Sequence, residues 1–517
     1  MKSLSDLRGK KRNLEAEREE LVRRWEELDR EIIDTQAECV AIYNSDSPIL
    51  SLPAEVTCLI FREAFSTLES SKENDIHPTE LILSHVCRQW RSTALELSFL
   101  WSSFYYHGPS ATPATLNRFE VYLNRSKSNR LELWLDLRET TPDQQLWAML
   151  DQTIAVVSRW WVVSIFSNST EIASRLKSKL KALYAPNLEH LTLHLHLKNP
   201  DTSMITSIEP QFITEGAPKL TSVWLDVSTS SFCLPPISIL TTLRIEFQEM
   251  DNFSTFLFSS AALRFILTLP NLENLSVVEV ESRDGPNGMG NATIVMNRLR
   301  HLRIKDSPAV FQLLPTIRAP ILETLVLRDA WINFRPDSTT NIHVPNVYSF
   351  PSLASLSLND VSCRPGHSMR YFTLMTSAVR QINVAHTTSY GTHGVLRYIV
   401  EQLSTEVIVW PHLENLICDL GRVDLDSANT LLKIVMQKSH TAGLTLRVSE
   451  FGMKAVKELI LPDPNFAGVL TIEEVTKMEL GNLGSWPPGG NGLLSKRIDL
   501  EADSFSTRRS TGFLYWS

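Results

Sequence analysis

A six-residue phrase that recurs along the middle of the chain restricts the fold more than any other feature. The phrase has the form Leu-x-x-Leu-x-Leu, with Val, Ile or Cys at some of the apolar positions. Its copies begin at Leu188, Leu220, Leu240, Leu272, Leu299, Leu322, Leu353, Val379 and Leu413. The apolar–x–apolar ending has a period of two, which is typical of a strand with one face turned inward. The recurrence therefore predicts a series of similar short strands.

The segments between copies predict helices and turns. Proline precedes several copies, as in Ala185-Pro186 and Phe350-Pro351, and ends whatever helix came before. Helices are predicted at residues 253–267, at 310–314 with Ser307-Pro308 as cap and first turn, and at 428–437. Because strand and helix alternate at intervals of 20 to 34 residues, the sequence predicts stacked units.

This pattern resembles the leucine-rich repeat, which implies an irregular right-handed α/β solenoid over residues 186–483. In that family, parallel strands line the concave side, and helices or loops form the convex side. Residues 109–185 are expected to be a linking or capping region with degenerate repeats, because residues 131–137 alternate and residues 160–163 form an apolar run. The final strands are expected at residues 444–448 and 469–472, and residues 484–517 are expected to form a polar C-terminal tail.

The predicted strands also define a candidate binding surface. The residue between the two inward apolar side chains, and the one after them, should share the concave face. The residues at these positions include His194, Trp224, Asp226, Arg244, Glu246, Arg303, Lys305, Arg328, Asn359 and Asn383. We expect Trp224 to anchor a partner, and Arg244, Arg303, Lys305 and Arg328 to favour an acidic or phosphorylated segment. The alternative is that these charges only solvate an exposed face.

A second informative stretch runs from Leu52 to Trp101. Pro53 suits the first turn of a helix, and apolar residues follow it at helical spacing. After a polar run, a second apolar stripe comprises Leu83, Val86, Cys87, Trp90, Ala94 and Leu97. Two facing helices are predicted, with Leu100 and Trp101 closing a third short element. Their apolar side chains exceed what so small a unit can bury, which points to a partner.

These residues resemble the F-box motif, which reads here as Leu52-Pro53, Ile60-Phe61, Val86-Cys87-Arg88-Gln89-Trp90-Arg91 and Leu100-Trp101. The linker at residues 68–79 is longer than in the compact form of the motif. The resemblance implies a small three-helix module over residues 48–108 that docks the Skp-type adaptor of a cullin–RING ubiquitin ligase. The implied adaptor-binding residues are Leu52, Pro53, Val56, Ile60, Phe61, Val86, Cys87 and Trp90. The alternative is an ordinary helical hairpin buried in its own domain.

The N-terminal segment, residues 1–47, is predicted to be an amphipathic, coiled-coil-like helix. Leucines recur every seven residues at Leu7, Leu14, Leu21 and Leu28, and no proline occurs between residues 5 and 43. Trp25 and Ile32 occupy companion positions, whereas Lys11 and Arg18 make the earlier part of the seam charged. We expect a second copy or another part of the chain to cover the leucines. A solvated helix with a weak seam is the alternative.

Composition bounds the class of protein. At 517 residues the chain exceeds the length of about 250–300 residues at which single cores stop growing. The net charge of -8 argues against a general nucleic-acid binder. Six cysteines without paired or metal-like spacing predict reduced, buried thiols. An apolar leader and a run of about 18 apolar residues are both absent, so we expect neither secretion nor membrane spanning, and a location in the cytoplasm, the nucleus or both.

Catalytic motifs are not found. The sequence has no Walker-type loop, no G-x-S-x-G elbow and no H-E-x-x-H helix, and the pair His194 and His196 alone is a weak metal signal. We therefore expect no enzymatic activity, no metal and no cofactor. The two resemblances together predict the substrate-recognition subunit of a Skp–cullin–F-box ubiquitin ligase, in which the repeat region binds a client protein. The alternative is a non-ligase interaction scaffold that uses the coil and the solenoid.

Overall fold

A computed structural model of the chain describes most of its first 420 residues and short pieces beyond them. The described residues are 3–45, 47–68, 79–195, 209–226, 229, 234–246, 257–258, 260–282, 292–332, 349–363, 367–386, 410–420, 445–449, 471–475 and 486. The chain divides into two compact units. Met1–Leu68 and Ile76–Leu100 belong to the first unit, and the chain from Trp101 onward belongs to the second.

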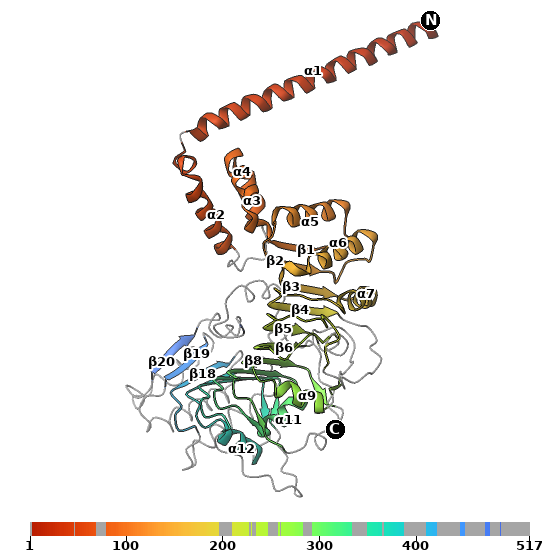
Figure 1. Ribbon diagram of the computed structural model, residues 1–517. Helices are drawn as coiled ribbons and strands as arrows, with labels where there is room; N and C mark the ends of the chain where they lie inside the picture. The colour runs from red at the N-terminus through yellow and green to blue at the C-terminus, as the bar shows by residue number, and fades with distance from the viewer. Residues whose placement is uncertain are drawn as a thin grey trace. The chain divides into compact units, whose positions relative to one another are not determined.

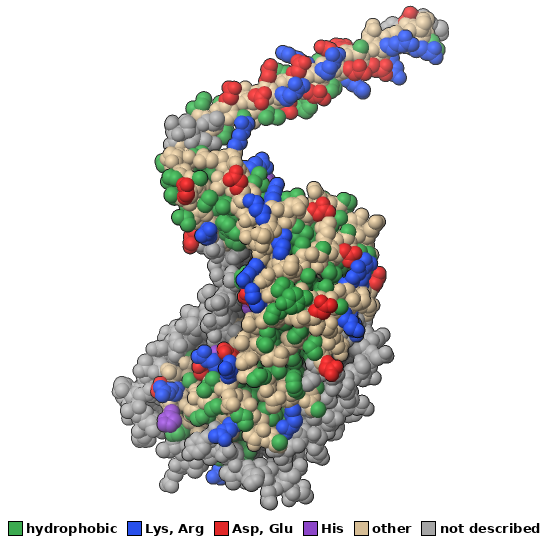
Figure 2. Space-filling model, in the orientation of Figure 1, with side chains coloured by type: hydrophobic (Ala, Val, Ile, Leu, Met, Phe, Trp, Pro, Cys, Tyr) green, Lys and Arg blue, Asp and Glu red, His purple; other side chains and the backbone are tan. Residues whose placement is uncertain are grey.

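The first unit is helical. It opens with the predicted N-terminal helix α1 (Leu4–Ser45), whose described side chains are exposed except at Ala37, which is half-buried. Figure 2 shows acidic, basic and hydrophobic side chains interspersed along this helix. The next elements are the 3-10 turn η1 (Pro48–Ser51) and the helix α2 (Ala54–Leu68), followed by α3 (Thr79–Val86), α4 (Arg88–Glu96) and the 3-10 turn η2 (Ser98–Trp101).

The second predicted helix of this stretch is in fact two helices separated at Cys87. Cys87 adopts an extended backbone (φ -156°, ψ 172°), and its Sγ accepts the Trp90 backbone N–H at 3.4 Å. Cys87 is therefore the N-cap of α4 instead of an interior helical position. Apolar spacing alone did not reveal the break, because the three- and four-residue rhythm continues through it.

The second unit contains a fourteen-stranded sheet in which every neighbouring pair of strands is parallel (Figure 1). The strands follow chain order, with β7, β9, β10, β12, β14 and β16 set apart in small two-stranded sheets. The strands of the large sheet are β1 (Ser103–His107), β2 (Leu131–Asp136), β3 (Trp160–Ser167), β4 (His190–Leu195), β5 (Ser222–Leu225), β6 (Thr242–Glu246), β8 (Asn274–Val278), β11 (His301–Lys305), β13 (Thr324–Arg328), β15 (Ser355–Asn359), β17 (Gln381–His386), β18 (Asn415–Leu420), β19 (Thr445–Ser449) and β20 (Thr471–Val475).

Each copy of the repeated phrase forms one strand of this sheet, from β4 to β18, as predicted. The apolar pairs align across neighbours, so that Leu302 of β11 lies between Leu275 of β8 and Leu325 of β13. All three side chains are fully buried. We call the side that carries these apolar pairs the leucine face, and the opposite side, which carries the alternating residues, the variable face.

Helices cover the leucine face of the first strands. Phe104 of β1, which pairs with Leu133 on the leucine face of β2, contacts Phe119 of α5 at a ring-centroid distance of 4.7 Å. Figure 1 shows α6 and α7 on the same side of the sheet. The described helices of this unit are α5 (Pro113–Arg125), α6 (Gln144–Ala155), α7 (Thr170–Leu180), α9 (Ser260–Leu267), α11 (Pro308–Leu313) and α12 (His367–Met375), with the 3-10 turns η3 (Val157–Arg159) and η4 (Leu314–Thr316).

The predicted inter-strand helices were correct only in part. Of residues 253–267, only Ser260–Leu267 form a described helix, and the small strand β7 (Leu257–Phe258) precedes it. Ser307 stands at the N-terminus of α11 but makes no cap; its Oγ accepts the Val280 N–H at 3.0 Å and donates to the Lys305 carbonyl at 2.8 Å. The helix predicted at residues 428–437 lies outside the described residues.

A left-handed turn recurs where several strands of the sheet end. Glu279, Asp306, Asp329 and Asp360 each follow the last residue of a strand with φ between 39° and 57°. The backbone N–H of each donates to the last or next-to-last residue of the following strand, as in Asp306 to Arg328 at 3.1 Å. The turns at Glu279, Asp329 and Asp360 lead to the small strands β9 (Glu281–Ser282), β14 (Trp331–Ile332) and β16 (Ser362–Cys363), and the turn at Asp306 leads to α11. The same backbone geometry thus recurs after successive strands of the large sheet.

Two further predictions are corrected. Residues 103–107, which the sequence assigns to the helical module 48–108, form the first strand of the sheet. Residues 109–185 contribute β2 and β3 to the sheet, and a linking or capping role with degenerate repeats stays a prediction for them. Trp101 is buried in the second unit, where its ring contacts Tyr122 at 5.2 Å and lies 4.4 Å from the Arg125 guanidinium. Cys39 is exposed, and Cys58 and Cys87 are half-buried, so these three thiols are not the buried ones expected.

Candidate functional site

The residues implicated in adaptor binding lie on and just before the helices α2, α3 and α4. Pro53, Val56 and Val86 are exposed. Leu52, Ile60, Cys87 and Trp90 are half-buried. Phe61 is fully buried, and its ring meets the Trp90 ring edge-on at 4.9 Å. Phe61 therefore belongs to the core of the helices, and its part in adaptor binding stays a prediction.

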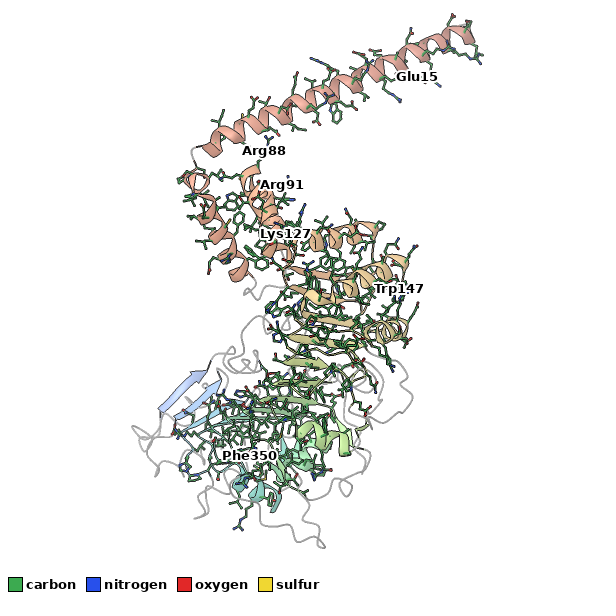
Figure 3. The ribbon with its side chains drawn as sticks, in the orientation of Figure 1. Glu15, Arg88, Arg91, Lys127, Trp147 and Phe350 are labelled. Carbon is green, nitrogen blue, oxygen red and sulfur yellow. The ribbon has the colours of Figure 1, made fainter. Side chains whose placement is uncertain are left out.

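Exposed apolar side chains accompany these residues on the same helices. Val56, Leu59, Ile82 and Val86 are 38%, 59%, 47% and 55% exposed. Scattered apolar residues are normal on protein surfaces, but four on two short helices whose core is already formed are consistent with a binding surface. Arg88 and Arg91, labelled in Figure 3, are exposed on α4.

Aromatic side chains line the variable face of the first five strands. Trp134, Phe166 and Trp224 form one buried cluster, which Tyr105 joins from β1. His194 fits between them, with ring-centroid distances of 5.0 Å to Phe166 and 4.5 Å to Trp224. The row ends in a cation–π contact, because the Arg244 guanidinium lies 3.9 Å from the centre of the Trp224 ring.

A charged cluster continues this row. Glu246 receives a bidentate pair of hydrogen bonds from Arg244, at 2.9 and 2.8 Å, and a third from Arg303 at 2.7 Å. Arg303 also donates from Nε to the Ser276 hydroxyl at 2.6 Å. The strands β6, β8 and β11 are adjacent, and their register places Ser276 between Arg244 and Arg303. We call these four residues the arginine cluster.

The arginine cluster holds its carboxylate ionised despite burial. Glu246 is fully buried, which acts to raise the pKa of its carboxyl. The charges of Arg244 and Arg303, with hydrogen bonds from Arg244 and Ser276, outweigh that effect and hold the pKa well below its ordinary value. Two guanidiniums thus share one carboxylate, with their donor edges turned toward it.

The structure brings the predicted binding residues onto one face but buries them. Trp224, Arg244, Arg303, Lys305 and Arg328 all alternate with the leucine-face residues, as predicted, and Lys305 pairs in register with Arg328. Their exposed fractions are 4%, 5%, 1%, 1% and 7%. The expectation of an exposed face is therefore wrong for these side chains, and so is the alternative that they merely solvate it. Their role in binding stays a prediction.

Trp486 is a site residue that the sequence analysis missed. Its ring centre lies 4.5 Å from the Arg303 guanidinium and 5.9 Å from that of Arg244. It belongs to the segment 484–517 that was predicted to be a polar tail, and it is the described residue nearest the C-terminus. No periodic pattern surrounds it, so only its being tryptophan in a polar tail could have drawn attention to it.

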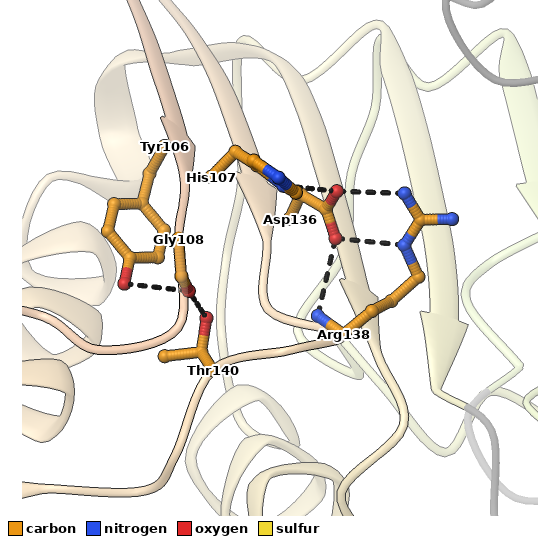
Figure 4. Close-up of polar contacts among 6 residues, drawn as sticks. All are labelled: Tyr106, His107, Gly108, Asp136, Arg138 and Thr140. Carbon is orange, nitrogen blue, oxygen red and sulfur yellow. Dashed lines mark hydrogen bonds and ion pairs between the residues drawn. The ribbon is translucent and has the colours of Figure 1, made fainter.

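A polar cluster stands at the ends of the first two strands (Figure 4). Asp136 accepts a hydrogen bond from Arg138 Nε at 2.9 Å and lies 2.8 Å from both Arg138 Nη2 and His107 Nδ1. Burial acts to raise the pKa of the Asp136 carboxyl, but its bonds to Arg138 and His107 outweigh burial and lower the pKa. The Arg138 guanidinium also lies 5.8 Å from the Phe166 ring, which connects this cluster to the aromatic row.

Within the described residues, no group of three or more His, Cys, Asp or Glu side chains is arranged to hold a metal ion. His196, one of the pair considered for that role, lies outside those residues. The described helices also include none with both the length and the apolar character needed to span a membrane. No known family model matches the chain, and no curated protein matches it either.

Proposed function

We propose that the chain is the substrate-recognition subunit of a Skp–cullin–F-box type ubiquitin ligase. The observation that carries the proposal is the exposed apolar set Val56, Leu59, Ile82 and Val86, beside a core already formed by Phe61 and Trp90. Val56 and Val86 are among the adaptor-binding residues that the resemblance to the F-box motif implies. An adaptor would bury side chains that these helices leave in water.

In this proposal the sheet is the strand layer of a solenoid of the leucine-rich-repeat type. Its support is the chain-ordered parallel register and the recurrence of left-handed turns at Glu279, Asp306, Asp329 and Asp360. Each described strand of the large sheet pairs with its neighbours in chain order, which is the arrangement expected of a repeat protein. The variable face would receive the client, and binding both partners would raise the client's local concentration near the ubiquitin carrier. The chain itself would carry out no chemistry.

The proposal is tested by measuring the affinity of the full-length chain for a purified Skp-type adaptor by isothermal titration calorimetry. We expect Val56→Asp and Val86→Asp each to raise the Kd about tenfold or more, because a carboxylate would be buried against apolar adaptor side chains. Leu21→Asp is the matched control, since Leu21 is 64% exposed on α1, away from the motif. It should leave the Kd unchanged.

The same measurement separates the ligase from the interaction scaffold. Circular dichroism melts of each variant establish that the helices remain folded, which both substitutions should permit because the two valines are exposed. A wild-type chain that shows no adaptor binding, or valine variants that bind as tightly as wild type, would contradict the ligase proposal and favour the scaffold. Binding that only the two valine variants lose would support it.

A further inference from the structure

The arginine cluster presents flat cationic faces instead of free donor edges. Arg244 donates from Nε and Nη2 to the Glu246 carboxylate. Arg303 donates from Nη2 to Glu246 and from Nε to Ser276. An acidic segment that approached through this edge would compete with Glu246 for its donors. Stacking on the guanidinium plane competes with none of these bonds.

Two tryptophan rings already lie close to these guanidiniums. Trp224 lies 3.9 Å from the Arg244 guanidinium, and Trp486 lies 4.5 Å from that of Arg303 and 5.9 Å from that of Arg244. Trp224 comes from the adjacent strand β5, whereas Trp486 comes from beyond the last described strand. The indole is the aromatic ring that binds cations best, so the cluster and Trp486 are chemically matched.

Trp486 is half-buried, and its ring lies near both guanidiniums of the arginine cluster. Its indole Nε1 is buried and has no hydrogen-bond partner among the described residues. A ring from another molecule would therefore not need to replace a specific hydrogen bond to take its place. Because Trp486 belongs to the same chain, it competes at the high effective concentration of a tethered group.

We propose that the arginine cluster is a receptor for an aromatic side chain, that Trp486 fills it in cis, and that a client docks by inserting its own tryptophan there. The inference rests on the proposed client-binding function and names the chemistry that its variable face recognises. An incoming ring would lie against the Arg303 guanidinium as Trp486 does, at a distance of 4.5 Å from it.

The test uses the full-length chain and N-acetyl-L-tryptophanamide as the probe, with binding measured by NMR titration of the probe. We expect Trp486→Ala to lower the Kd about tenfold, which corresponds to a site that Trp486 fills about nine-tenths of the time. Trp486→Leu should give the same gain, because leucine offers no π face. Trp486→Phe should retain most of the block, because it keeps an aromatic ring.

Trp147→Ala is the matched control. Trp147, labelled in Figure 3, lies on α6 with its ring centre 4.3 Å from the Arg175 guanidinium, so its loss removes a similar contact away from the variable face. It should leave probe affinity unchanged. In the Trp486→Ala background, Arg303→Lys should remove the gain, because lysine retains the charge but not the planar face. A melting curve for this variant establishes that the sheet still folds.

The inference is overturned if Trp486→Ala and Trp486→Leu bind the probe no more tightly than wild type and Trp147→Ala. It is also overturned if Trp486→Phe opens the site as fully as Trp486→Leu, because an aromatic face would then be irrelevant. Adaptor affinity measured on the same proteins keeps this result apart from the proposed function. If the chain binds the adaptor but the Trp486 substitutions do not change probe affinity, only the aromatic-receptor inference is contradicted. If the chain does not bind the adaptor but the substitutions change probe affinity as expected, only the ligase proposal is contradicted.

Discussion

Glu246 is the residue on which the charged part of the variable face depends. Its carboxylate is fully buried and receives three hydrogen bonds from two guanidiniums. A buried ion pair is not strongly stabilising in itself, because desolvation offsets much of the attraction. Removing one partner of a buried ion pair is strongly destabilising, however, because the remaining charge stays buried without a counter-charge. Arg244 and Arg303 would then face each other without the group that both now share.

We therefore predict that Glu246→Gln lowers the free energy of unfolding by about 3–5 kcal/mol at neutral pH, measured by urea denaturation. The control is Asp151→Asn, which removes an exposed carboxylate lying between Arg175 and Lys179 and should cost less than about 1 kcal/mol. Equal effects of the two substitutions would contradict the prediction.

Acidification should remove the stabilisation that the Glu246 carboxylate provides. The folded-state pKa of Glu246 lies well below its unfolded value, so its stabilisation is present above the unfolded pKa and is lost as pH falls through the folded pKa. We predict that the unfolding free energy of the wild type falls below about pH 4.3, the ordinary glutamate pKa, more steeply than that of Glu246→Gln. Denaturation series between neutral and acidic pH measure this, and parallel curves would contradict it.

Sequence reasoning located the side chains of this face but not their burial. A strand period of two places Trp224, Arg244 and Glu246 on the side opposite the leucines. It carries no information about what lies over that side, and here Trp486 comes from a remote, non-periodic segment. Trp134 and Phe166 were not assigned to the face because their strands lie before the regular phrases begin.

At the scale of elements, the break at Cys87 and the strand at residues 103–107 show two limits of periodicity. The apolar spacing from Leu83 to Leu97 fits one helix, and only the extended backbone at Cys87 divides it. Residues Ser103–His107 join the sheet by pairing with β2, which is a non-local contact that local propensity does not encode. The helix α1 and the strands β4 to β18 were predicted because each repeats a simple pattern several times.

Helix α1 carries an element-scale prediction. Leu21, Trp25, Leu28 and Ile32 are 64%, 65%, 42% and 54% exposed along one seam. Because a long isolated helix gains most of its stability from packing, we predict that the full-length chain self-associates through this seam. Sedimentation should show a mass that rises with concentration, and Leu21→Asp with Leu28→Asp should abolish the rise. Leu7→Asp, where the companion residue is Lys11, should have less effect. A wild-type chain that stays monomeric would contradict self-association.

At the scale of the whole molecule, two compact units imply two separable stabilities. Leu302 is fully buried on the leucine face, between Leu275 and Leu325, and Phe61 is fully buried against Trp90. We predict that Leu302→Ala destabilises the sheet by about 2–5 kcal/mol and leaves adaptor affinity unchanged. Phe61→Ala should cost the helical unit about 3–5 kcal/mol and weaken adaptor binding.

Differential scanning calorimetry with adaptor titrations on the same proteins measures both effects. Each substitution should shift one thermal transition and leave the other in place, because each removes contacts from a different core. A single transition that both substitutions shift would mean that the chain unfolds as one cooperative body. Loss of adaptor binding in Leu302→Ala would likewise mean that the docking helices depend on the sheet, so that recognition of the adaptor and of the client could not be altered independently.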